Sequence, residues 1–87
     1  MLVVEVAETS YRIDREYKAS RYARGGIPEC WIVDLVHATL EMHREPEASP
    51  TALYGWRYAN AQTLRPPTAV APLVAPGSFI AVTDLLT

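Results

Sequence analysis

The chain has little cysteine, no long apolar run and no strong charge of either sign. Cys30 is the single cysteine among 87 residues, which excludes an internal disulfide and a multi-cysteine metal site. The first residues lack the basic start and long apolar core of a signal peptide, and no apolar run could span a bilayer. We therefore expect a soluble, cytoplasmic protein with no membrane association.

The formal net charge of -2 gives the surface no general attraction to nucleic acids. Basic residues nevertheless gather in one segment, between positions 12 and 24, where only Asp14 and Glu16 oppose them. The segment holds Arg12, Arg15, Lys18, Arg21 and Arg24. It is either a solvated helix face or a surface that contacts phosphates, and both interpretations stay open.

The familiar signatures of several enzyme classes are missing. There is no glycine-rich phosphate loop and no nucleophile elbow. His37 and His43 lie on either side of an expected turn, and Glu41 would share a strand face with His43, but no second cluster accompanies them. Surface histidines are the favoured interpretation over a metal site.

The periodicity of apolar residues predicts three strands and a helix in the first half of the chain. Leu2–Ala7 is a short valine-rich strand, and 13–24 is a helix that the pair Gly25-Gly26 ends. Residues 30–36 form an apolar, β-branched strand, and 39–44 alternate as a half-exposed strand does. Strand, helix, strand predicts a parallel pair, and a reversal at 37–38 predicts an antiparallel hairpin.

The second half is rich in proline, which prevents long regular elements. We expect a loop between Pro46 and Pro50, a strand at 53–58 and a last short strand at 79–82. A chain of this length buries only roughly 60 to 65% of its unfolded surface, so its core is thin. The expected fold is a single α/β domain, 1–87, with a mixed α+β sheet.

Glu5 is the unusual residue of the first strand. Alternation places Val3, Glu5 and Ala7 on one face, and both faces are apolar around the carboxylate. If a helix covers that face, Glu5 needs a cation, a metal ion or hydrogen-bond donors as partners. Lys18 is the nearest candidate, because the spacing of residues 14, 18 and 22 places them on one stripe of the helix. Spacing alone favours the plainer alternative, a solvent-facing Glu5 and an ordinary surface ion pair.

Three consecutive segments carry a family resemblance. The strand "VVEVA", the helix "RIDREYKASRYARGGIPE" and the strand "CWIVDL" resemble, in the same order, the Uma-type restriction endonucleases, a branch of the PD-(D/E)XK nuclease superfamily. The closing segment "PLVAPGSFIAVTDLL" is similar to the end of that family. The resemblance covers nearly the whole chain and implies part of a restriction-endonuclease-like core, strand-helix-strand-strand followed by short strands.

The resemblance also implies roles for single residues. Glu5 matches the acid that ligates Mg²⁺, or Mn²⁺, with the main-chain carbonyl of Val6 as a further ligand. Ala7 stands where the superfamily usually has its lysine, and Lys18 on the helix takes that lysine's place.

Other matched positions imply supporting or structural roles. Asp14 and Tyr22 match helix positions that support the site. Trp31 and Asp34 match the next strand, and Trp31 is expected in the core rather than on DNA.

The implied function is Mg²⁺-dependent cleavage of DNA. The family's other acid, the Asp of its "PD" element, should come from a strand before Glu5, and Met1 leaves no room for it. We therefore expect an N-terminally truncated member, whose unpaired strand edge favours self-association into a homo-oligomer. Two alternatives stay open: a non-catalytic module that binds nucleic acid, and a module that completes the sheet of a partner. The nucleic-acid contacts would come from Arg12, Arg15, Arg21 and Arg24.

Overall fold

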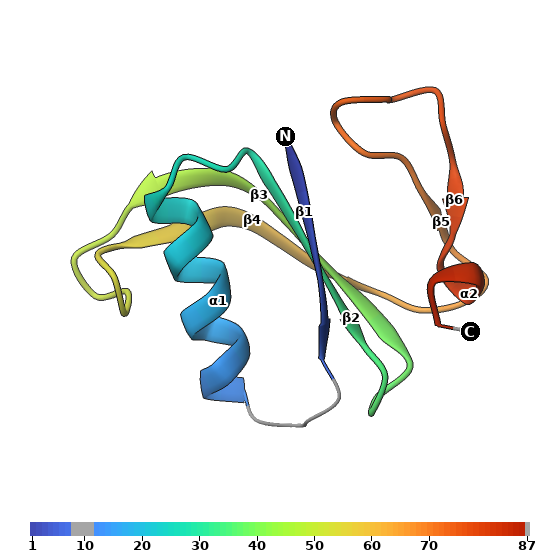
Figure 1. The fold of residues 1–87 in the computed structure, drawn as a ribbon, viewed down its shortest axis with the longest axis horizontal. Coiled ribbons are helices and arrows are strands. Elements are labelled where there is room, and N and C mark those ends of the chain that lie inside the picture. Colours follow the sequence, from blue (N-terminus) through green and yellow to red (C-terminus); the bar gives the residue numbers. More distant parts are fainter. Residues whose placement is uncertain (8–11, 87) are drawn as a thin grey trace.

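The computed structural model describes residues 1–7 and 12–86, except for the side chains of residues 12–14. A four-stranded sheet in the order β1-β2-β3-β4 forms its centre (Figure 1). The strands are β1 (Leu2–Ala7), β2 (Glu29–Asp34), β3 (Thr39–Ala48) and β4 (Trp56–Leu64). β1 and β2 run parallel, and the other neighbours are antiparallel. The mixed sheet confirms the expected α+β class and the order strand, helix, strand, strand.

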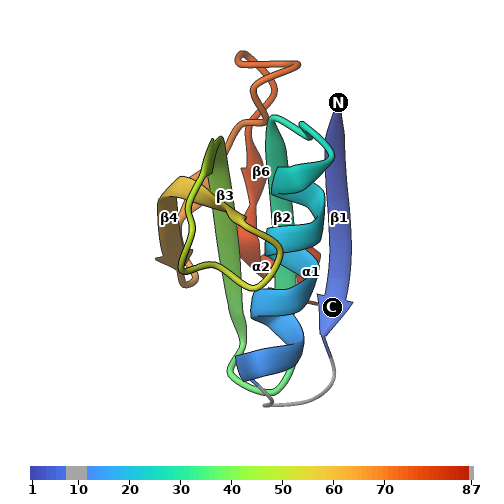
Figure 2. The ribbon, with the colours of Figure 1, turned by 90° about the vertical axis from the view of Figure 1, so that its left-hand side faces the viewer.

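Helix α1 (Arg12–Arg24) covers one face of the sheet. Its interior contains no glycine or proline, and it ends where Gly25 and Gly26 follow, Gly26 with a φ of 75°. Ala19 and Ala23 are buried and let the helix approach β2, β3 and β4 closely. Figure 2 shows α1 in front of the sheet, with β1 beside it. Within the described residues, no helix has the length and apolarity needed to span a membrane.

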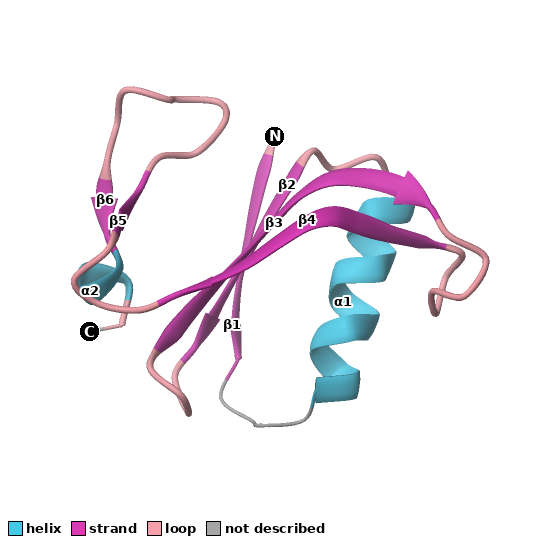
Figure 3. Cartoon of the chain, turned by 180° about the vertical axis from the view of Figure 1, so that it is seen from behind, coloured by secondary structure: helices cyan, strands magenta, loops and turns pink. Residues whose placement is uncertain are grey.

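The C-terminal segment covers the opposite face. β5 (Ala69–Val70) and β6 (Ile80–Ala81) form a small antiparallel pair, followed by the short helix α2 (Val82–Leu85). Figure 3 shows these elements on the side of the sheet opposite α1. They close an apolar cluster of buried side chains, which consists of Trp31, Val33, Leu40, Met42, Val70 and Val82. The core position expected for Trp31 is confirmed.

Three expected elements in the second half were placed wrongly. β3 continues through Pro46 to Ala48, where a loop was expected. The pairing of β3 with β2 ends at Arg44, so beyond that residue β3 is hydrogen-bonded to β4 alone. Pro46, which has no N–H, is tolerated there because one edge of β3 is unpaired. The strand expected at 53–58 starts at Trp56 and runs to Leu64, because its partner β3 is longer than the alternation indicated. The strand expected at 79–82 shortens to Ile80–Ala81, since Val82 begins α2.

Candidate functional site

Glu5 meets two side chains of α1 at the edge of the sheet. The Tyr22 hydroxyl donates a hydrogen bond to Oε1 of Glu5, and Lys18 Nζ lies 3.9 Å from Oε2. The side chains of Lys18 and Glu5 are 30% and 27% exposed, because α1 packs on β2, β3 and β4 and leaves β1 at its flank. The structure therefore brings together the acid and the lysine expected from the sequence, within reach of solvent.

Tyr22 holds the carboxylate of Glu5 in place. Its hydrogen bond to Glu5 raises the pKa of Tyr22, and burial raises it further. The phenol therefore stays protonated at neutral pH and is able to donate to Glu5. The supporting role expected for Tyr22 stays a prediction.

The main-chain carbonyl of Val6 faces the open side of β1. Leu35 N donates to Ala7 O at 3.0 Å, so the carbonyl of Ala7 points toward β2. Successive carbonyls of a strand point to opposite edges, and that of Val6 therefore points away from β2. Ala7, which stands where the superfamily usually has its lysine, is buried in the apolar cluster under α1. An alanine supplies no positive charge to the site.

The chemistry of these donors fits a hard divalent cation only in part. Mg²⁺ in proteins takes one or two carboxylates and fills its other positions with water and substrate phosphate. Glu5 and the Val6 carbonyl offer two oxygens of this kind. Among the described residues, no group of three or more His, Cys, Asp or Glu gathers in a metal-binding arrangement. The second carboxylate that the family resemblance implies stays a prediction.

The arginines that were expected to contact nucleic acid do not all lie on one surface. Arg21 and Arg24 are exposed on the outer face of α1. The side chains of Arg12 and Asp14 lie outside the described part of the structure. Arg15 turns toward the sheet, where its guanidinium lies 3.1 Å from Asp34 and 3.0 Å from Glu41.

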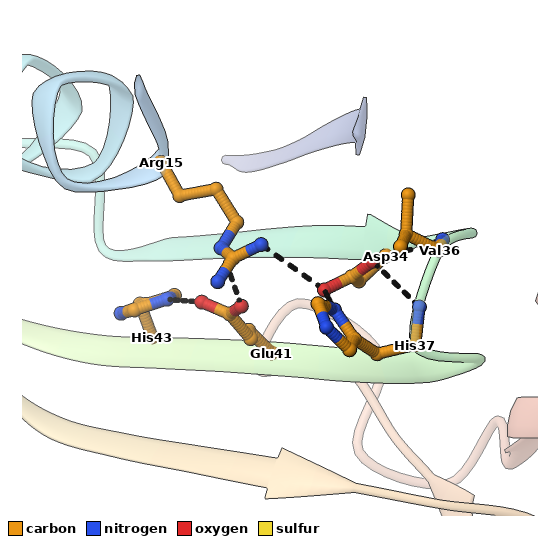
Figure 4. A network of polar contacts seen from close by, with 6 residues as sticks. All are labelled: Arg15, Asp34, Val36, His37, Glu41 and His43. Carbon is orange, nitrogen blue, oxygen red and sulfur yellow. Dashed lines mark hydrogen bonds and ion pairs between the residues drawn. The ribbon is translucent and has the colours of Figure 1, made fainter. Parts of the chain in front are cut away.

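Arg15 belongs to a polar network at the end of β2, shown in Figure 4. Asp34 is 2% exposed and accepts hydrogen bonds from the main-chain N–H groups of Val36 and His37, both at 3.0 Å. His37 Nδ1 lies 2.8 Å from the other oxygen, beside Arg15. Asp34 therefore ties the β2–β3 turn to α1, and both of its oxygens are in use.

The environment of Asp34 sets its charge. Burial alone would raise the pKa of Asp34, but hydrogen bonds from the side chain and main chain of His37 lower it, and the charges of His37 and Arg15 act in the same direction. The net direction is downward. Asp34 is a structural anion rather than a second metal ligand.

Asp34→Asn is expected to lower the free energy of unfolding by about 1–3 kcal/mol at pH 7, because charge-assisted hydrogen bonds are lost. The pKa of Asp34 is lower in the folded protein than in the unfolded chain, where it is about 3.9. This stabilisation is therefore present above that value and is lost as the pH falls through the folded pKa. Urea unfolding should show a gap between the free energies of the two proteins that narrows as the pH falls below about 3.9. A gap independent of pH would contradict this role.

Glu29 is a residue that sequence reasoning missed. It is 1% exposed and accepts hydrogen bonds from Trp31 Nε1 at 2.9 Å, from Leu73 N at 2.8 Å and from Arg44 Nε. Arg44 also donates to Ala71 O at 2.7 Å. The sequence did contain a signal for this role, because Glu29 is an acidic residue at the start of an otherwise apolar strand. Its role is to fasten the C-terminal segment to the sheet.

Cys30 and a cavity beside α1 are not part of the site formed by Glu5, Lys18 and Tyr22. Burial, with the negative charges of Glu5 and Glu41, raises the pKa of the Cys30 thiol to about 12, so it is no nucleophile at neutral pH. A cavity of about 540 Å³ lies between α1, β3 and β4, with Arg15, Glu41 and Trp56 in its lining. Glu5 and Lys18 are not part of that lining.

Comparison with known proteins identifies the group to which this arrangement belongs. The model of one family, described as "Uma2: Putative restriction endonuclease", matches residues 1–83. No match was found among curated proteins or among solved structures. The match includes β1, α1 and β2, the elements that bring Glu5, Lys18 and Tyr22 together. The chain belongs to the Uma2 family of putative restriction endonucleases.

Proposed function

We propose that the chain provides half of the active site of a Mg²⁺-dependent DNA endonuclease. The observation that carries the proposal is the convergence of Lys18 and Tyr22 on Glu5 at the open edge of β1. The family match supports the reaction class. A partly exposed carboxylate that is held by one phenol and one ammonium group suits a site that must receive a cation and a phosphate.

Each residue has a distinct role in this proposal. Glu5 and the Val6 carbonyl hold the divalent cation, whose chemistry is to polarise the phosphoryl group and activate water. Lys18 places a positive charge beside the phosphate, where negative charge develops during hydrolysis. Tyr22 fixes the orientation of Glu5 through its hydroxyl.

The second carboxylate is proposed to come from a strand that pairs with the open edge of β1. Within the described residues, β1 is bonded to β2 alone, and Val4 and Val6 are 47% and 54% exposed. A second copy can supply that strand. If two β1 strands pair antiparallel around Glu5, the two Glu5 side chains lie on one face with Cβ atoms about 4.5–5.5 Å apart. A cation between them would offset their repulsion.

The test is plasmid nicking by the chain alone. Supercoiled DNA should be nicked with Mg²⁺ or Mn²⁺ and not with EDTA, and the rate should rise faster than linearly with protein concentration. Val4→Lys puts a charge beside the pairing edge and should lower the rate about tenfold, the effect of roughly 1.4 kcal/mol on the dimer equilibrium. Sedimentation should show the same loss of dimer. A monomeric wild type that nicks DNA at full rate would overturn the role given to the edge.

A second candidate is a non-catalytic module that binds nucleic acid or completes the sheet of a partner. The exposed Arg21 and Arg24 favour the first form, and the open edge of β1 favours the second. Salt-dependent DNA binding without cleavage, unchanged by Mg²⁺, would select the binding module. Arg15 is a weaker candidate for DNA contact than Arg21 and Arg24, because Asp34 and Glu41 already engage it. The cytoplasmic location stays a prediction.

A further inference from the structure

The outer surface of α1 carries alternating tyrosine and arginine side chains next to the site. We call this surface the tyrosine-arginine band, and it consists of Tyr17, Arg21, Tyr22, Arg24 and Tyr54. Tyr17, Arg21 and Arg24 follow one another at the i, i+4, i+7 spacing of a single helix face. Tyr54 joins them from the loop between β3 and β4, which Figure 2 shows against the helix.

The rings and guanidinium groups of the band are in contact. Arg24 Cζ lies 4.6 Å from the centroid of the Tyr54 ring, and the rings of Tyr17 and Tyr54 meet edge to face with centroids 5.6 Å apart. Arg21 Cζ lies 5.5 Å from the centroid of the Tyr22 ring. Since the hydroxyl of Tyr22 donates to Glu5, the band leads from the β3–β4 loop to the candidate site.

The loop is fastened to the helix independently of these rings. Ser20 is buried, donates to Trp56 O at 2.6 Å and accepts from Tyr54 N at 3.0 Å. The Ser20 hydroxyl therefore holds the main chain of the loop against α1, and the contacts of the Tyr54 ring add to this attachment. Tyr17 is 44% exposed, although burial of a ring is favourable.

The charges of the band are available to a ligand. Among the described side chains, no ion pair joins Arg21 or Arg24 to a carboxylate, whereas Arg15, Arg44 and Arg57 are all paired. A guanidinium has five N–H donors, so one that also contacts a ring can still donate to a phosphate. Tyr17 is exposed and Tyr54 is half-buried, and an accessible aromatic face stacks with bases, each of which has such a face.

We propose that the tyrosine-arginine band binds unpaired nucleotides of a DNA strand and leads that strand to Glu5. Arg21 and Arg24 contact phosphates, and Tyr17 and Tyr54 stack with bases. In a duplex the base faces are covered by their neighbours, so the band prefers single-stranded DNA or the unpaired part of a junction. Only one part of this inference rests on the proposed nuclease, namely that the bound DNA strand continues from the band to Glu5.

The test measures DNA binding in EDTA, where no cleavage occurs. Fluorescence anisotropy should show tighter binding of a short labelled single strand than of the matching duplex at equal salt. Tyr54→Leu should weaken single-strand binding about tenfold, and Tyr54→Phe, which keeps the ring, should weaken it less than about twofold. Arg24→Gln should weaken binding severalfold, whereas Arg65→Gln, an equal change of charge outside the band, should have little effect.

The outcomes separate this inference from the proposed nuclease. Tyr17→Leu serves as a second variant if Tyr54→Leu lowers the melting temperature, because Tyr17 is on the helix surface. Equal affinity for single strand and duplex, or wild-type affinity in folded Tyr17→Leu and Tyr54→Leu, would overturn the inference. Glu5→Gln should keep its affinity for the single strand. A failure of cleavage with intact binding would therefore count against the nuclease alone.

Discussion

Replacing Glu5 with glutamine is expected to lower the rate of Mg²⁺-dependent plasmid nicking by about 10²–10³-fold. Glutamine keeps the size of the side chain and can still accept a hydrogen bond from Tyr22, but it removes the negative charge that attracts the cation. A ligand to a catalytic metal is worth several kcal/mol in the transition state, and each 1.36 kcal/mol changes the rate about tenfold. Initial nicking rates at fixed protein and Mg²⁺ concentration are the measurement.

The matched control for this change is Glu47→Gln. Glu47 is on β3, is 43% exposed and pairs with Arg57 at 3.0 Å, so the control removes one carboxylate in an ion pair far from the site in sequence. It should nick at the wild-type rate. Equal losses in both variants would show that net charge, rather than the position of Glu5, sets the rate.

Replacing Glu29 with alanine is expected to destabilise the protein strongly. The change leaves Trp31 Nε1 and Leu73 N without their acceptor, and it leaves Arg44 without its carboxylate. Removing one partner of a buried ion pair costs about 3–5 kcal/mol. A domain of this size has roughly 4–13 kcal/mol in total. Thermal unfolding followed by circular dichroism should show a fall in Tm of at least about 12 °C.

Glu29→Gln separates the hydrogen bonds from the charge. The amide oxygen can still accept from Trp31 or Leu73, but the charge opposite Arg44 is lost. Its Tm should lie between those of wild type and Glu29→Ala. A Glu29→Ala protein with wild-type Tm would refute the view that this carboxylate fastens the C-terminal segment to the sheet.

The fold of the first half was accessible from sequence because its signals are local. The bounds of β1 were predicted as observed, and α1 begins one residue earlier than expected, at Arg12. Valine-rich alternation and the Gly25-Gly26 stop depend on neighbours along the chain only. The lengths of β3 and β4 depend instead on their pairing with each other. Pro46 wrongly indicated a loop, because a proline is tolerated in β3 only where the pairing with β2 has ended.

The candidate site was accessible in part for the same reason. A carboxylate between apolar neighbours needs a partner, and Lys18 and Tyr22 fall on the right helix face. The ties of Arg15 to Asp34 and Glu41 could not be predicted, because they cross between α1, β2 and β3. Tyr54 was overlooked because its loop reaches α1 only through the bonds of Ser20.

The measurement that tests the central claim most directly compares nicking rates of Glu5→Gln, Lys18→Met and the double variant. If both residues serve one reaction, removing either disables the site, and the double variant should be within a few-fold of the slower single variant. Melting temperatures would confirm that all three proteins are folded. The account predicts three comparably inactive, folded proteins. Nicking at the wild-type rate by the folded double variant would contradict it.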